Sequence, residues 1–128
     1  MLYVRETNKS IDEVCTKIQE AAAQNKFGVL AVIDLKEKMA AKGVQFGPQC
    51  RIIELCNPVQ AKKVLESDMT ISSALPCRIS VYEEAGKVKV ITLKPTVLLN
   101  LFGNPELELV ARDVENAILL IIDTACGK

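Results

Sequence analysis

The stretch CRIIELCNP at residues 50–58 decides the fold. Its first seven residues are largely apolar on both faces of an extended chain, which is typical of an interior strand of a sheet. Asn57 is a good N-cap, and Pro58 suits the first helical turn because its missing N–H would be unpaired there anyway. We therefore expect a strand that passes directly into a helix, and we expect that helix to end near Ser67.

Downstream of this unit the chain predicts an antiparallel hairpin and a C-terminal helix. Residues 77–82 and 87–90 each alternate apolar and polar side chains, with a turn at residues 84–86 between them. A short helix is expected over residues 96–101, and residues 107–125 carry an apolar stripe at helical spacing. Three further leucines lie off this stripe: Leu109, Leu119 and Leu120. A helix that is apolar on more than one face is either deeply buried or shared with a partner subunit.

Upstream, the chain predicts two more strands and two more helices. Residues 3–7 read as a short strand, and Ser10 with Glu13 forms the pattern of a capping box at the start of a helix. The continuous apolar run 28–33 predicts a buried strand. Asp34 repeats the capping pattern for a short helix after that strand.

The order of these elements predicts an α+β fold in a single domain, residues 1–128. We expect a mixed, mostly antiparallel sheet with helices packed on one face. Two strand–helix–strand (βαβ) units of ferredoxin-like type, a hairpin and the C-terminal helix would build it.

Composition excludes several classes of partner. Sixteen basic residues balance sixteen acidic ones, whereas nucleic-acid and anionic-membrane binders usually have a basic excess. The longest strongly apolar run, residues 117–122, is far too short to span a bilayer. No secretory segment is visible at the N-terminus, so we expect a cytoplasmic protein whose five cysteines are reduced. The chain has no histidine, which removes the commonest general base and metal ligand.

Several motifs occur together in this chain: residues 42–44, 52–58, Ala61, Leu65, Asp68, 75–77 and 81–83. Together they resemble the prokaryotic family known as domain of unknown function 302, and the resemblance is strongest between residues 43 and 84. The sequence departs from the family pattern at Cys50, where an aromatic residue is expected, and at Lys94, where an acidic residue often precedes the proline. The resemblance implies a compact α+β unit that pairs as a homodimer, and it supplies no mechanism.

Cys56 and Cys77 are the candidate thiol site. Cys56 directly precedes a capped helix N-terminus, where N–H groups and the helix dipole favour a thiolate. The other interpretation is a small hydrophobe buried under the strand–helix junction, which is common for free cysteine. Cys77 is in phase with Ile79 and Val81, so we expect its side chain on the core face.

The two cysteines are expected to lie apart within one chain. If the helix between them makes a parallel crossover, Cys56 and Cys77 sit at opposite ends of neighbouring strands, roughly 20 Å apart at ~3.3 Å per residue. A disulfide needs Cα atoms within about 7 Å. Cys50 is then the better intrachain partner for Cys77, unless a dimer brings Cys56 and Cys77 together across subunits.

Charged residues near this unit offer further candidate roles. Glu54 lies in an apolar strand, where its carboxyl would act as an acid or base if its pKa were raised, or would pair with Arg51 or Arg78. Arg78, Lys87 and Lys89 share the polar face of the hairpin. That face would bind a small anion or would simply be solvated.

These observations leave two functions open. The first is a small cytoplasmic homodimer that binds a small molecule or a protein partner without standard catalysis. The alternative is a thiol redox or soft-metal-binding protein centred on Cys56, with Cys77 or Cys50 in support and Glu54, Asn57 and Pro58 around it. The sequence specifies no cofactor and no metal.

Overall fold

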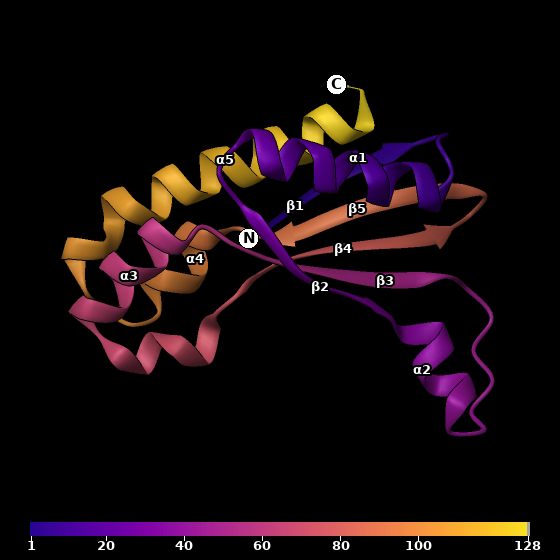
Figure 1. The fold of residues 1–128 in the computed structure, drawn as a ribbon, viewed down its shortest axis with the longest axis horizontal. Helices are drawn as coiled ribbons and strands as arrows, with labels where there is room; N and C mark the ends of the chain where they lie inside the picture. The colour runs from indigo at the N-terminus through magenta and orange to yellow at the C-terminus, as the bar shows by residue number, and fades with distance from the viewer. Residues whose placement is uncertain (128) are drawn as a thin grey trace.

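The computed structural model describes residues 1–127. Residues 1–127 form one five-stranded sheet and five α-helices, with two short 3-10 segments, η1 and η2, between them (Figure 1). In chain order the elements are β1 (Leu2–Thr7), α1 (Ile11–Gln24), β2 (Gly28–Asp34), α2 (Leu35–Ala41), β3 (Cys50–Cys56), α3 (Pro58–Ser67), η1 (Met69–Ala74), β4 (Cys77–Glu84), β5 (Lys87–Leu93), α4 (Pro95–Asn100), η2 (Pro105–Leu107) and α5 (Glu108–Cys126).

The strands follow the order β1-β5-β4-β3-β2, and every adjacent pair is antiparallel. The α+β class is confirmed, and so is the interior position of β3. The expected parallel crossover through α3 is corrected, because α3 and η1 return the chain to the end of the sheet that β3 has just reached. β4 therefore runs back along β3 as an antiparallel neighbour.

Helices α1 and α5 lie side by side on one face of the sheet (Figure 1), as the sequence predicts. The core fills the space between these two helices and the strands because the apolar stripe of each helix faces the sheet. Its fully buried members include Val14, Ile18, Ile53, Leu55, Ile79, Val81, Val90, Ile118, Ile121 and Ile122.

Local capping sets the helix starts as the sequence predicts. Ser10 Oγ accepts a hydrogen bond from the backbone N–H of Glu13, and Asp34 Oδ1 accepts one from Glu37. Asn57 Oδ1 accepts from the first free N–H groups of α3, and Pro58 is the first helical residue. Each cap satisfies donors that have no partner inside the helix.

The hairpin between β4 and β5 turns on two residues. Ala85 has φ 55° and Gly86 has φ 76°, so both central residues are left-handed. This conformation matches the right-handed twist of the two strands, which is why two-residue hairpin loops favour it.

One expectation about burial is corrected. β2 is an edge strand, and Leu30 is 63% exposed at a β-bulge, so the apolar run 28–33 is not a buried strand. On α3, Val59 points to solvent and Val64 is the buried residue. The apolar run of β2 instead borders a face of the sheet that α1 and α5 leave uncovered.

That uncovered side is called here the open face, defined by one row of side chains that crosses all five strands. The register pairs its members from strand to strand, so they share one side of the sheet. The row consists of Val4, Ile91, Ser80, Ile52 and Ile33.

Ion pairs flank the row of the open face on both sides. Arg78 Nε lies 3.2 Å from Glu54 Oε2, and Lys89 Nζ lies 3.7 Å from Glu6 Oε1. An apolar centre with a charged rim is the usual composition of a protein interface.

Among residues 1–127, no helix combines the length and the apolar character needed to cross a bilayer.

Candidate functional site

The antiparallel pairing of β3 and β4 brings Cys56 and Cys77 to the same end of the sheet. Leu55 lies opposite Cys77 in the register, so Cys56 lies one residue beyond the position that faces Cys77. The expected separation of the two thiols is therefore wrong, because it assumed a parallel crossover. Cys50 lies opposite Tyr82 at the far end of β3, which also overturns its expected role as the closer partner of Cys77.

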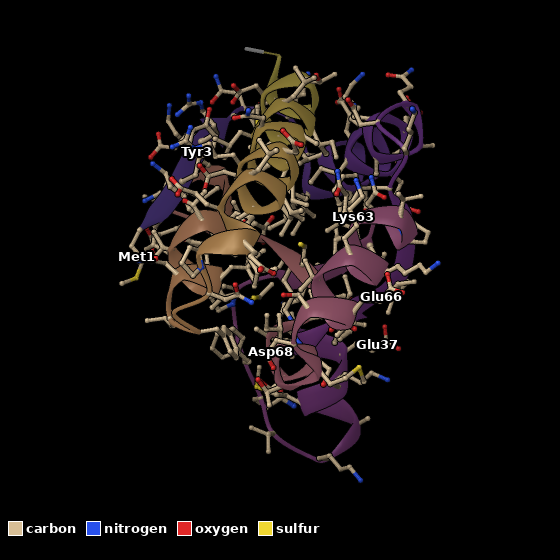
Figure 2. The ribbon with its side chains drawn as sticks, turned by 90° about the vertical axis from the view of Figure 1, so that its left-hand side faces the viewer. Met1, Tyr3, Glu37, Lys63, Glu66 and Asp68 are labelled. Atoms are coloured by element: carbon tan, nitrogen blue, oxygen red, sulfur yellow. The ribbon has the colours of Figure 1, made fainter. Side chains whose placement is uncertain are left out.

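Both thiols line a cavity of about 110 Å³ between this end of the sheet and helices α3, α4 and α5. Figure 2 looks onto this end of the molecule, where Lys63 and Glu66 mark α3. The walls are mostly apolar because the core-facing ends of three strands meet the inner sides of the helices here. The apolar lining includes Phe27, Leu55, Val64, Leu75, Leu98 and Leu99.

Burial controls the chemistry of the two thiols. Burial raises the pKa of Cys56, and burial together with the nearby charge of Cys56 raises the pKa of Cys77 from 9.0 to about 11. Both side chains are therefore neutral S–H groups near pH 7. The first N–H groups of α3 bind Asn57 Oδ1, at 3.1 Å from Val59 N and 3.2 Å from Gln60 N. These contacts favour the interpretation of Cys56 and Cys77 as small apolar groups over that of thiolates.

Three polar side chains that line the cavity differ in their hydrogen bonding. Thr92 Oγ1 donates to the carbonyl oxygen of Arg78 at 2.7 Å, and Asn57 Oδ1 is occupied by its capping bonds. The Oε1 atom of Gln60 is buried and has no hydrogen-bond partner among residues 1–127. Sequence reasoning missed Gln60, although its position four residues before Val64 places it on the inner face of α3.

Glu54 and Arg78 form a cross-strand ion pair on the opposite side of the sheet from the core. This contact is one of the two pairings that the sequence left open for Glu54. In the described part of the chain, no three or more His, Cys, Asp or Glu side chains gather in a way that could hold a metal ion.

The cations of the hairpin are spread along it. Lys89 Nζ lies 2.6 Å from Glu84 Oε1, and Arg78 is paired with Glu54, so carboxylates already offset both charges. Lys87 is exposed at the turn end of β5, opposite Glu84 and far along the hairpin from Arg78. The structure does not bring Arg78, Lys87 and Lys89 together around one point.

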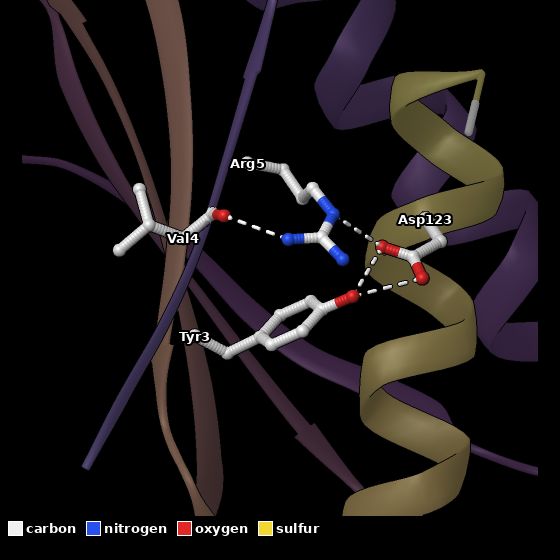
Figure 3. A network of polar contacts seen from close by, with 4 residues as sticks. All are labelled: Tyr3, Val4, Arg5 and Asp123. Atoms are coloured by element: carbon white, nitrogen blue, oxygen red, sulfur yellow. Dashed lines mark hydrogen bonds and ion pairs between the residues drawn. The ribbon is translucent and has the colours of Figure 1, made fainter.

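A second polar cluster, which the sequence did not predict, ties β1 to α5 (Figure 3). Tyr3 Oη donates to the carboxylate of Asp123, at 2.7 Å from Oδ1, and Arg5 Nε lies 3.0 Å from the same oxygen. The Arg5 guanidinium also lies over the Tyr3 ring, 4.2 Å from its centre. Tyr3 Oη and Arg5 Nε both donate to the Asp123 carboxylate, and Arg5 Nη1 donates to the carbonyl oxygen of Val4, so the cluster is a structural contact between the ends of the chain.

The fold and the cavity define an α+β protein with an antiparallel five-stranded sheet and an apolar cavity at one end of it. The chain belongs to the family described as "Domain of unknown function DUF302", whose model matches residues 3–125. The structure is similar to that of an uncharacterized conserved DUF302 protein from Bacillus stearothermophilus, with a TM-score of 0.92 and 32% sequence identity over 98% of this chain and 97% of that chain. No curated protein matches the chain.

Proposed function

We propose that this protein is a cytoplasmic homodimer that binds a small, mostly apolar molecule in the cavity beside Cys56 and Cys77, without standard catalysis. The observation that carries this proposal is the cavity itself. Small-molecule sites are concave, mostly apolar and provided with few polar groups, and this one combines apolar walls with the Gln60 amide. Its volume of about 110 Å³ suits a compact ligand.

Binding is tested with toluene, followed by amide chemical shifts in nuclear magnetic resonance spectra. We expect saturable shifts at residues of the cavity. Ala61→Phe fills the cavity from α3 and should abolish these shifts, whereas Ala40→Phe on the exposed side of α2 should leave them unchanged. Equal binding by wild type and Ala61→Phe would contradict the proposal, and so would failure of the wild type to bind both toluene and phenol.

A second candidate function is thiol redox or soft-metal chemistry, and the shared cavity of Cys56 and Cys77 supports it. Oxidised glutathione would convert the two thiols to a disulfide, releasing two molecules of reduced glutathione. Intact mass measurement then shows the loss of two hydrogens, and peptide mapping locates the bond. Rapid formation of a Cys56–Cys77 disulfide, absent in Cys56→Ser, would favour this function. If neither thiol reacts with oxidised glutathione, a binding cavity with inert thiols is favoured.

The open face supports pairing with a second copy of the chain. Four of the five side chains in its row are apolar, and the charged groups beside the row are paired with opposite charges on the same chain, which limits repulsion between two copies. Five cysteines cannot all pair within one chain, which agrees with reduced thiols in a compartment such as the cytoplasm.

A further inference from the structure

The cavity contains one polar group that residues 1–127 leave unsatisfied. Gln60 lines the cavity, and its Oε1 atom is buried without a hydrogen-bond partner in this part of the chain. The backbone of Gln60 is held in place because its N–H donates to Asn57 Oδ1. Burying an unpaired amide oxygen costs free energy, so a ligand that supplies a hydrogen bond here removes that cost.

The remaining polar side chains that line the cavity already have partners within the protein. Asn57 Oδ1 caps α3, and Thr92 Oγ1 donates to the carbonyl oxygen of Arg78. The guanidinium of Arg78 is bound to Glu54 at 3.2 Å. No unpaired charge of the described residues therefore lines the cavity, and a charged ligand would lose its hydration without gaining a counter-ion.

The volume limits the size of the apolar part of the ligand. A dry apolar cavity of ~150 Å³ holds one benzene molecule in another protein. The cavity described here has a volume of about 110 Å³ and is open to solvent at one side. This volume is smaller than the one that encloses benzene, so an apolar body of at most about six non-hydrogen atoms fits here, with part of it toward the open side.

We propose that the ligand is a compact, neutral molecule with an apolar body and one hydroxyl group, and that this hydroxyl forms a hydrogen bond with the side-chain amide of Gln60. The inference rests on the proposed binding function and assigns the ligand class. A hydroxyl both donates and accepts, so it pairs with either end of the amide. The neutral thiols of Cys56 and Cys77 complete the apolar contact surface around the ring or chain.

The test compares phenol with toluene, which replaces the hydroxyl by a methyl group of similar size. Dissociation constants for both are measured by nuclear magnetic resonance titration on the wild type and on Gln60→Leu. We expect Gln60→Leu to weaken phenol binding about tenfold relative to toluene binding, the loss of one buried hydrogen bond. Comparing the ratio of the two affinities between variants cancels the different hydration of the two probes.

Gln49→Leu is the matched control, because Gln49 Oε1 is the other buried side-chain oxygen without a partner in the described residues and is absent from the cavity lining. That variant should leave the phenol-to-toluene ratio unchanged. Gln60→Met serves as a second variant if Gln60→Leu fails to fold. An unchanged ratio in the Gln60 variants overturns the ligand class and leaves the proposed binding function standing, whereas failure of both probes to bind the wild type overturns the function itself.

Discussion

Position within a strand decides the chemistry of Cys77. The residue begins β4 on the core side, in phase with the buried Ile79 and Val81, and residues 1–127 offer it no cationic partner strong enough to offset burial. Arg78 lowers the pKa of Cys77 less than burial raises it, because the Arg78 side chain points to the other face and pairs with Glu54. The thiol is held neutral by its surroundings rather than activated by them.

This raised pKa makes stability depend on pH in a predictable direction. The Cys77 thiol ionises near 9.0 in the unfolded chain and near 11 in the folded protein, so the folded state retains the proton between these values. The stabilisation is complete below pH 9 and is lost as the pH rises to 11, by about 2 kcal/mol. Urea unfolding at about pH 8 and about pH 11 should show a smaller decrease for Cys77→Val than for the wild type. Equal decreases in the two proteins would contradict the assignment.

At the scale of secondary-structure elements, the sequence predicts features that depend on neighbouring residues and misses features that depend on residues far along the chain. Caps at Ser10, Asp34 and Asn57 are predicted correctly because each involves neighbours two or three residues away. The position of β2 at the edge is not predicted, because an apolar run is compatible with either a buried strand or an edge strand beside an uncovered face.

The same contrast between near and distant causes holds for the candidate site. The sequence identifies Cys56, Asn57 and Cys77 as junction residues, and these residues do line the cavity. The two thiols are wrongly predicted from the sequence to lie at opposite ends of neighbouring strands. The direction of β4 depends on how η1 returns the chain to the sheet, and no local sequence pattern encodes that. Gln60 and the Tyr3–Asp123 contact are missed, since their significance comes from distant neighbours.

The contact between β1 and α5 yields a second prediction. Asp123→Asn removes the charge that Tyr3 and Arg5 share, and should lower the free energy of unfolding by about 1–2 kcal/mol, because hydrogen bonds to a charged group exceed neutral ones in strength. Arg112→Gln removes an exposed ion pair within α5 and should change it by less than about 0.5 kcal/mol. Chemical denaturation measures both, and equal effects would show that the cluster adds nothing beyond a surface pair.

At the scale of the whole molecule, two exposed apolar surfaces compete as sites for a second copy. The open face offers a continuous row across five strands, with Val4 at its edge 40% exposed. Helix α5 offers Leu109 and Leu120, which are 71% and 54% exposed but eleven positions apart along the helix. Continuity favours the open face, since interfaces require contiguous apolar area.

Charge substitution separates these surfaces. Val4→Lys places a charge in the row of the open face and should convert the proposed dimer to a monomer, whereas Leu120→Lys should leave the proposed dimer intact. Sedimentation equilibrium measures the mass of each variant and of the wild type. A monomeric wild type refutes pairing, and dissociation by Leu120→Lys alone assigns the interface to α5.

The strand order also has a consequence for synthesis. β1 leaves the ribosome before the other four strands described here, yet it pairs with β5, which ends at Leu93. Nascent β1 therefore remains without its β5 partner while most of the chain is made. The contact between Tyr3 and Asp123 likewise joins residues that are 120 positions apart. Sheets closed by such distant pairing fold late and slowly. A translational pause before β5 would leave this open edge available to other nascent chains.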